Sequence, residues 1–255
     1  MSRLDPRLLL QCYAAGIFPM ADSRDAAELF WVEPRHRAII PLPDFHLSRS
    51  LRRTLRSGRF QITLDRDFAG VIRACANREE TWINDEIESA MLALHATGHA
   101  HSIEVWHGSE AGHELVGGLY GVRLGRAFFG ESMFSTMADA SKVALAWLVA
   151  RLKVGGFTLL DCQFMTDHLA SLGAVSVPRA GYIALLSGAL GGGSAGGGTA
   201  LPSGVGAGMI APASAGTPVA SPDFLALDRL LDATGAAGAP GPAGYVIAQL
   251  LGQTS

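Results

Sequence analysis

The residues best suited to chemistry lie where an apolar run turns polar. Residues 157–160 predict a buried strand, and Asp161, Cys162 and Gln163 follow directly. Residues two apart in a strand point to the same side, so Asp161 and Gln163 should share one face, with Cys162 on the other. A buried polar group without a partner costs about 1–3 kcal/mol, so both need hydrogen bonds. Two interpretations stay open: a reactive site, or a strand end that caps the helix predicted after Thr166.

The elements that would position these residues predict an α+β protein whose mixed sheet is flanked by helices. Residues 102–107, 115–124 and 127–129 read as strands. A long amphipathic helix follows over 138–154, and Gly155-Gly156 closes it. Glycines inside the second strand indicate bulges or close approach of a ligand.

Composition divides the chain into four segments. Residues 1–62 predict a small α/β N-terminal domain, and residues 63–186 predict the larger, catalytic domain. Residues 187–222 are rich in Gly, Ala, Ser and Pro and carry no charge, which is typical of a linker. Residues 223–255 predict a short tail with a possible helix.

The composition excludes several classes of protein. The chain has 255 residues, of which 49% are hydrophobic, so it can bury a substantial core. No apolar run reaches the roughly 18 residues that cross a bilayer, and the start lacks the layout of a signal peptide. We therefore expect a cytoplasmic protein without membrane contact. Cys12, Cys75 and Cys162 are too few and too scattered for a disulfide framework or a zinc site, so no metal is expected.

Positive charge is concentrated near the N-terminus although the net charge is −3. Nine arginines lie between residues 35 and 73, against three aspartates. Residues 48–57 predict a short helix in which Leu51 and Leu55 face inward. Four arginines share its other side: Arg49, Arg52, Arg53 and Arg56. They form either a phosphate-binding face or an ordinary solvated one.

Short motifs follow one another in a fixed order over residues 8–186. They are Tyr13-Ala14-Ala15-Gly16-Ile17-Phe18-Pro19, Trp31 with Pro34-Arg35, His46-Leu47-Ser48-Arg49-Ser50, Thr81-Trp82-Ile83, His99-Ala100-His101-Ser102-Ile103-Glu104-Val105-Trp106, Leu115-Val116-Gly117-Gly118-Leu119-Tyr120-Gly121-Val122, Gly130-Glu131-Ser132-Met133-Phe134-Ser135, Ala140-Ser141-Lys142, Asp161-Cys162-Gln163 and Asp167-His168 with Ala170-Ser171-Leu172-Gly173-Ala174. Together they resemble the leucyl/phenylalanyl-tRNA–protein transferases, bacterial enzymes of the N-degron pathway. The set is specific because of its order, since any one motif is weak.

The resemblance implies an activity and a fold. Such enzymes move Leu, Phe or, less well, Met from its tRNA onto proteins whose N-terminal residue is Arg or Lys, which marks them for proteolysis. Their catalytic domain looks like the GNAT acetyltransferase fold, preceded by a smaller domain. The acyl donor is the aminoacyl-tRNA itself, so no cofactor is expected. We expect a monomer.

The resemblance also implies the reaction centre. Asp161 and Gln163 would sit there, with Gln163 accepting a hydrogen bond from the attacking amine and Asp161 fixing Gln163. Glu131 would be an active-site carboxylate suited to the positive side chain of the acceptor.

Further residues would bind the donor. Its side chain would enter an apolar pocket that includes Leu119, Phe128 and Leu148, positions that ordinary core packing would also explain. Trp31 and Trp82 would lie against the terminal adenosine of the tRNA, where stacking contributes roughly 1–3 kcal/mol. The phosphates of the acceptor stem would be held by Arg35, Arg49, Arg52, Arg53 and Arg56.

Two other functions remain as alternatives. An N-acyltransferase of the same fold could use an acyl-CoA donor, but it needs a glycine-rich phosphate loop that opens a helix, and no such loop follows a strand in the expected place. A tRNA-binding module without catalysis would not need Glu131, Asp161 and Gln163 together.

Overall fold

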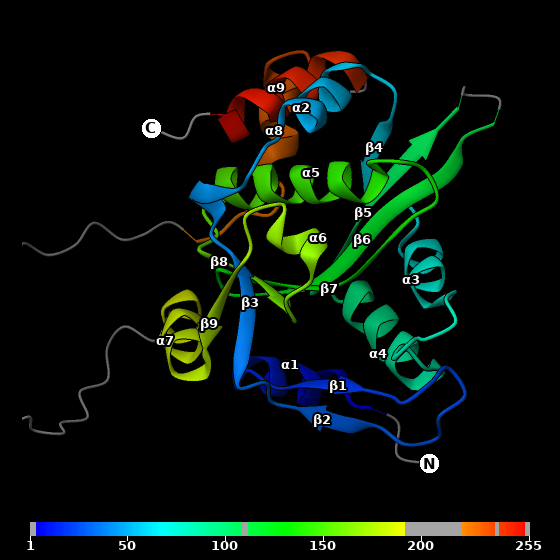
Figure 1. Cartoon of the computed structure of the whole chain (residues 1–255), viewed down its shortest axis with the longest axis vertical. Coiled ribbons are helices and arrows are strands. Elements are labelled where there is room, and N and C mark those ends of the chain that lie inside the picture. The colour runs from blue at the N-terminus through cyan, green and yellow to red at the C-terminus, as the bar shows by residue number, and fades with distance from the viewer. Residues whose placement is uncertain (1–3, 109–111, 192–220, 238–239, 253–255) are drawn as a thin grey trace, which may run out of the picture.

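A seven-stranded mixed sheet carries the fold (Figure 1). The computed structural model describes residues 4–108, 112–191, 221–237 and 240–252. In spatial order the strands are β4 (Gln61–Leu64), β5 (Ala100–His107), β6 (Glu114–Leu124), β7 (Ala127–Ser135), β8 (Leu159–Gln163), β3 (His36–Ile40) and β9 (Val175–Pro178). Neighbouring strands are antiparallel except β7 and β8, which are parallel and joined by helix α5 (Ala140–Val154). A separate antiparallel pair consists of β1 (Phe18–Met20) and β2 (Phe30–Val32).

Helices cover both faces of the sheet and define two hydrophobic cores. One face packs against α1 (Pro6–Ala14), α3 (Phe68–Ala76), α4 (Asp85–Ala96) and α7 (Arg179–Ala189). The other packs against α5, on which α2 (Arg49–Arg56), α8 (Ala226–Ala233) and α9 (Pro240–Gly252) pack in turn. The short helices η1 (Leu42–Asp44) and α6 (Asp167–Ala170) complete the described elements. The predicted α+β fold with a mixed sheet is therefore confirmed.

Helix starts follow the capping signals of the sequence. The Asp5 side chain accepts from the Arg7 N–H and Pro6 opens α1, while the Ser48 hydroxyl accepts from the Leu51 N–H at the start of α2. Such caps satisfy amide groups that the helix itself leaves unpaired. Leu51 and Leu55 are buried, as predicted, so α2 turns its arginines outward.

The seven-stranded sheet contains strands from both sides of the predicted domain boundary after residue 62. Strand β3, from the predicted N-terminal domain, lies between β8 and β9, which come from the predicted catalytic domain. This pairing joins segments more than a hundred residues apart, so no local pattern reveals it. Strand β7 is also longer than predicted, which places Glu131 inside the strand rather than after it.

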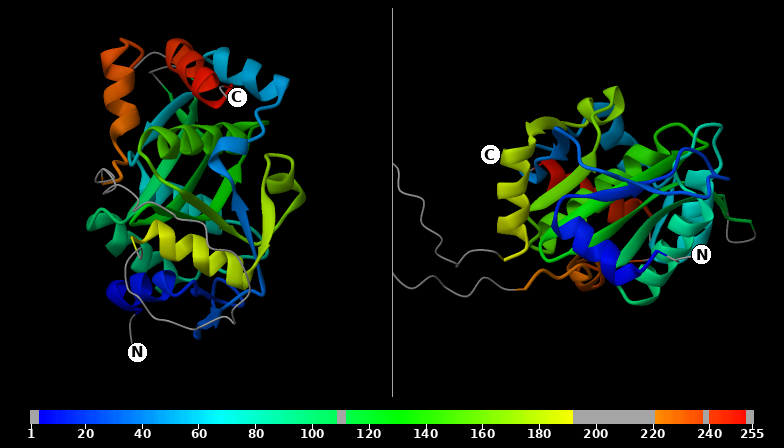
Figure 2. Two further views of the ribbon diagram at one scale, coloured as in Figure 1. Left: turned by 90° about the vertical axis from the view of Figure 1, so that its left-hand side faces the viewer. Right: turned by 90° about the horizontal axis from the view of Figure 1, so that it is seen from below.

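The C-terminal segment is part of the folded body rather than a loose tail. Phe224, Leu227, Leu231, Ile247 and Leu251 are all buried in the core that contains α5. Helix α9 lies beside α2, with α8 on its other side, at the end of the molecule opposite α1 (Figure 2). One short helix was predicted here, whereas the structure has two. The predicted linker falls largely on residues 192–220, outside the described residues.

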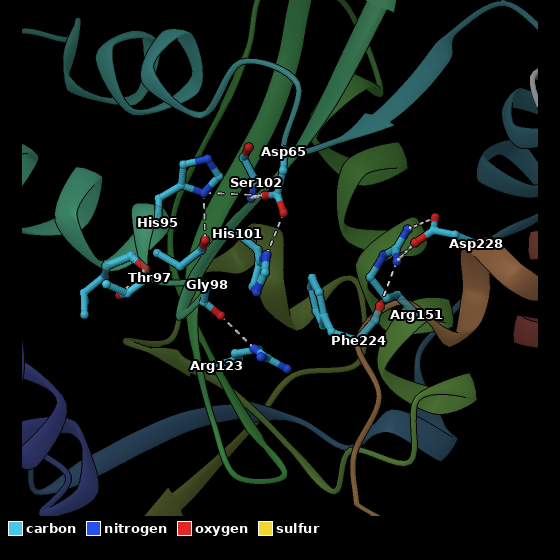
Figure 3. A network of polar contacts seen from close by, with 12 residues as sticks. Asp65, His95, Thr97, Gly98, His101, Ser102, Arg123, Arg151, Phe224 and Asp228 are labelled. Carbon is cyan, nitrogen blue, oxygen red and sulfur yellow. Dashed lines mark hydrogen bonds and ion pairs between the residues drawn. The ribbon is translucent and has the colours of Figure 1, made fainter.

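A buried arginine anchors this segment. Arg151 on α5 donates to both carboxylate oxygens of Asp228 at 2.6 Å and to the Phe224 carbonyl at 2.7 Å (Figure 3). The Phe224 ring lies between Arg151 and His101, with its centroid 4.4 Å from that of the imidazole. The described helices include none of the length and apolarity needed to span a bilayer.

Candidate active site

Asp161 on β8 is fully buried and receives several hydrogen bonds. Arg37 on β3 donates Nε to both carboxylate oxygens, at 2.9 and 3.0 Å, and Nη2 to Oδ2 at 2.7 Å. The Tyr182 hydroxyl donates to Oδ2 at 2.7 Å. Burial by itself would lower the pKa of Arg37, but the Asp161 carboxylate outweighs it and the pKa is raised. Arg37 therefore stays charged, and it and Asp161 supply each other with the hydrogen bonds that buried polar groups require.

Arg37 itself is fixed by its surroundings. Its Nη1 donates to the Gly16 carbonyl at 3.3 Å, and its guanidinium lies 4.5 Å from the ring centroid of Phe18 and 4.8 Å from that of Tyr182. Arg37 is one of the nine arginines of the basic stretch between residues 35 and 73, and the sequence did not predict that it is buried. The pattern offered only one hint, a basic residue at the start of an apolar strand.

Gln163 ends β8 in a strained conformation. Its φ is +62°, in the left-handed region that residues with a Cβ rarely adopt. The Asp161 Oδ1 atom accepts the Gln163 backbone N–H at 2.8 Å and supports this turn. The register against β3 also shifts: Ile39 pairs with Asp161 and Ala38 with Gln163, so Cys162 is an extra, bulged residue.

The bulge overturns the predicted alternation of faces. Gln163 and Cys162 both line a cavity of about 230 Å³, whereas Asp161 points toward Arg37 and Tyr182. Asp161 therefore acts on Gln163 through the backbone and not through the side-chain amide. Burial raises the pKa of the Cys162 thiol, with the Asp161 charge adding to it, so this thiol is neutral.

Glu131 on β7 holds the Gln163 side chain. The Gln163 Nε2 donates to Glu131 Oε1 at 2.9 Å, which turns the amide oxygen away from the carboxylate. Glu131 is only 8% exposed, and burial raises its pKa to about 7, with the Asp161 charge adding to the effect and the Gln163 hydrogen bond opposing it. Glu131 is thus poised to change its protonation state near neutral pH.

Two tyrosines surround this carboxylate. The Tyr13 and Tyr120 side chains are buried, and burial, followed by the charge of Glu131, raises the pKa of both phenols. Although Tyr13 lies close enough to influence Glu131, its hydroxyl does not reach hydrogen-bonding geometry, and Glu131 Oε2 also has no partner among the described residues. Both tyrosines lie within the motifs of the sequence, but neither was predicted as a site residue.

The cavity beside Gln163 is mainly apolar. Its aliphatic lining includes Leu119, Met133, Leu145, Leu148, Leu160 and Leu169, and its polar lining includes Arg78, Ser132, Thr166 and His168. Of the three predicted pocket residues, Leu119 and Leu148 are in this lining. Phe128 is not: its ring is stacked on Phe224, with centroids 5.5 Å apart and planes at 5°. This placement corrects the prediction, and it arises because the C-terminal segment supplies a partner ring.

The two predicted stacking tryptophans differ in position. Trp82 lines the cavity, whereas Trp31, on β2, is 43% exposed and lies outside the lining. The segments are adjacent, because Trp31 pairs with Pro19 and the Ala21 N–H donates to the Trp82 carbonyl. A further aromatic, Phe164, was missed. It lines the cavity, is 45% exposed and packs edge-on against Phe18.

The predicted phosphate-binding arginines fall into two groups. Arg49, Arg52, Arg53 and Arg56 line one hollow on α2. Arg35 does not belong to it, because it precedes β3 and its carbonyl accepts from the Arg179 N–H at the start of α7.

Comparison with known proteins agrees with the motif order. The family model described as leucyl/phenylalanyl-tRNA protein transferase matches residues 39–187, and that of the family's N-terminal domain matches residues 2–35. Proteins named leucyl/phenylalanyl-tRNA–protein transferase match at 55% identity in Rhizorhabdus wittichii, over all of both chains, and at 60% in Cereibacter sphaeroides, over 74% of this chain and 86% of that one.

Among solved structures, one titled "Crystal structure of FemX" aligns at 11% identity over 67% of this chain and 66% of that chain, with a TM-score of 0.48. The sequence matches are decisive by themselves. The chain belongs to the leucyl/phenylalanyl-tRNA–protein transferase family.

Proposed function

We propose that this protein transfers Leu or Phe from aminoacyl-tRNA to the N-terminal α-amine of an acceptor protein. The observation that carries the proposal is the connected network of Arg37, Asp161, Gln163 and Glu131 beside a leucine-lined cavity. An apolar cavity with a few convergent polar groups suits an apolar side chain whose reactive end must be aimed. Met as a poorer donor, and Arg or Lys as the acceptor's first residue, belong to the same proposal.

The reaction is the aminolysis of an ester. The amine nitrogen bonds to the ester carbonyl carbon, the bond from that carbon to the ribose oxygen breaks, and a proton passes from the amine to the departing oxygen. An α-amine has a pKa of about 7.7–8.0, so part of it is neutral near pH 7 without a strong base. Holding the amine against the ester then supplies much of the acceleration.

Gln163 is the residue suited to aim the amine. Its Nε2 is bound to Glu131, so the Oε1 atom can accept an N–H from the acceptor. A neutral amide is a poor base, so we assign it positioning rather than proton removal. Asp161 stabilises the strained backbone of Gln163 by accepting its N–H, and Arg37 and Tyr182 hold the Asp161 carboxylate in place.

Glu131 is assigned two tasks. It orients the Gln163 amide, and in its ionised form it offers negative charge to an acceptor that begins with Arg or Lys. Its raised pKa means that this charge is present mainly above about pH 7. Glu131→Gln should keep the hydrogen-bonding shape but weaken the preference for basic acceptors.

We further propose a GNAT-like catalytic domain, action in the cytoplasm as a monomer, and no cofactor. Among the described strands, β7 and β8 form the single parallel pair in an otherwise antiparallel sheet, and α5 joins them, which supports the fold assignment. In this function the product is a substrate for the N-degron proteolytic pathway.

A transfer assay tests the proposal. Purified protein is mixed with Phe-tRNA or Leu-tRNA carrying a labelled amino acid and with a peptide that starts with Arg or with Ala. Label is expected on the Arg peptide alone. Tight tRNA binding without transfer would favour a binding module, and transfer from an acyl-CoA instead would favour the other acyltransferase.

A further inference from the structure

The hollow on α2 is built from two distant parts of the chain. Arg49, Arg52, Arg53 and Arg56 share its lining with Tyr245 of α9. The two helices pack closely: Gly244 lies against the Leu55 carbonyl, and a Cβ at Gly58 would lie 3.3 Å from the Gly241 nitrogen. Helix α9 therefore forms one wall of the arginine face.

Tyr245 presents a partly exposed aromatic ring beside the arginines of α2. It is 52% exposed, and the Arg56 guanidinium lies 5.1 Å from its ring centroid. A tyrosine that served only the core would be covered. Here the ring leaves much of its area open beside a row of cations, which is the combination of stacking surface and positive charge that proteins present to nucleic acid strands.

The charge of this face is not neutralised by the described residues around it. None of the four arginines forms an ion pair with a carboxylate in the described part of the chain. Neither α2 nor α9 contains an Asp or Glu. Asp44 lines a neighbouring hollow together with Arg52, so one end of the face is nearer to a negative charge.

Polar contacts connect this face to the cavity. The Thr54 hydroxyl of α2 donates to Asp139 Oδ2 at 3.2 Å, and Lys142 Nζ lies 3.9 Å from Asp139 Oδ1. The pKa of His168, in the cavity lining, is lowered by burial and then by the charge of Lys142. Lys142, near the start of α5, is therefore a positive group that lies between Asp139 beside α2 and His168 in the cavity lining.

We infer that the C-terminal helix α9 is part of the RNA-binding surface, with Tyr245 stacking on a base or ribose while the α2 arginines hold phosphates. The inference rests on the proposed function and assigns a role to a segment that the sequence left without one. Arg151 holds Phe224 and Asp228 at the start of this segment, and the Lys153 Nζ of α5 donates to the Leu250 carbonyl of α9 at 3.1 Å, so α5 holds α9 beside α2.

Equilibrium binding of Phe-tRNA at several salt concentrations tests the inference. Tyr245→Ala should bind about fivefold or more weakly, the effect of losing one stacking contact, with the salt dependence unchanged. Arg53→Ala should also weaken binding, and should reduce the slope of log K against log salt by about 0.7–0.9, the value for one phosphate contact. Tyr245→Phe keeps the ring and should bind like the wild type.

Two further variants separate a lost contact from a damaged fold. Tyr245→Leu keeps apolar cover on α9 but removes the ring, so it should bind as weakly as Tyr245→Ala. Leu185→Ala, at a residue of α7 with 45% exposure, is the control and should bind like the wild type. If both Tyr245→Ala and Tyr245→Leu bound Phe-tRNA as tightly as the wild type, the inference would be overturned.

A minimal donor, 3′-phenylalanyl-adenosine, distinguishes this inference from the proposed function. The wild type should transfer Phe from both donors, and the rise in KM for Tyr245→Ala should be larger with Phe-tRNA than with the minimal donor. If KM rose equally with both donors, α9 would not be part of the RNA-binding surface, while the proposed transferase function would still hold. A wild type inactive with both donors would refute the transferase proposal itself.

Discussion

Gln163 donates its side-chain amide to Glu131 at 2.9 Å and its backbone N–H to Asp161 at 2.8 Å. Two carboxylates on neighbouring parallel strands therefore hold one residue by different groups. Asp161 stabilises a backbone conformation that glutamine rarely adopts, and Glu131 selects the direction of the amide. The strain at φ +62° identifies the position as one that the surrounding structure is built to maintain.

Replacing Gln163 should separate its side-chain role from its backbone role. Both Gln163→Ala and Gln163→Gly should lower transfer by about 10²-fold, because the amine is no longer aimed. Gln163→Gly should be more stable than Gln163→Ala by about 1 kcal/mol, since glycine adopts positive φ without a Cβ clash.

Activity and chemical denaturation check this pair of expectations. Gln11→Ala, an exposed glutamine on α1, is the matched control and should leave both quantities near the wild-type values. Normal turnover by Gln163→Ala would eliminate the positioning role, and equal stability of the two variants would argue against the strain.

The raised pKa of Glu131 should make stability depend on pH. Its folded pKa of about 7 lies above the unfolded value of about 4.3, so the folded state holds a proton that the unfolded state has lost. The resulting stabilisation is fully present below about pH 4.3 and is lost as pH rises through 7. Between these values this one group should lower the free energy of unfolding by up to about 1.4 kcal/mol per pH unit.

Urea denaturation of the wild type and Glu131→Gln across this pH range measures the effect. The variant carries no titrating group at this site. The free energy of unfolding of the wild type, relative to that of the variant, should therefore fall steadily with rising pH. A constant difference from pH 4.5 to pH 7 would show that Glu131 ionises normally in the folded protein.

Breaking the buried ion pair should be costly. Arg37→Ala leaves the fully buried Asp161 charge without its main partner, and such a loss costs about 3–5 kcal/mol. Arg179→Ala removes one partner of the half-exposed pair with Glu33 and should cost at most about 1 kcal/mol. Thermal unfolding compares the two variants directly. Similar costs would mean that the Arg37 pair is worth no more than a surface pair.

Much of the fold follows from local signals, whereas the site depends on long-range contacts. The caps at Asp5 and Ser48 and the inward faces of Leu51 and Leu55 could be predicted because each is decided within one turn of helix. Arg37 could not be placed, because its burial results from β3 entering the sheet beside β8. The same is true of the bulge at Cys162, which local alternation cannot predict.

The candidate residues illustrate the same division. Asp161, Gln163 and Glu131 were expected together from the motif order, and the structure brings them into one network. Phe128 was assigned to the pocket, but Phe224, almost a hundred residues later, occupies its open face. A segment that looked like a tail thus determined the position of a residue in the sheet.

Phe224 should be the residue on which attachment of the C-terminal helices most depends. It is 2% exposed and is surrounded by Phe128, Phe157 and His101, so Phe224→Ala should lower the free energy of unfolding by about 3–5 kcal/mol. The adjacent Leu225→Ala, at a residue with 49% exposure, should change it by less than about 0.5 kcal/mol. Urea denaturation with limited proteolysis checks both, and Phe224→Ala should also be cleaved faster within residues 221–252. If Phe224→Ala were as stable and as resistant as Leu225→Ala, α8 and α9 would not be held by this ring, and the wall they form beside α2 would need another anchor, with the Arg151–Asp228 pair the next to test.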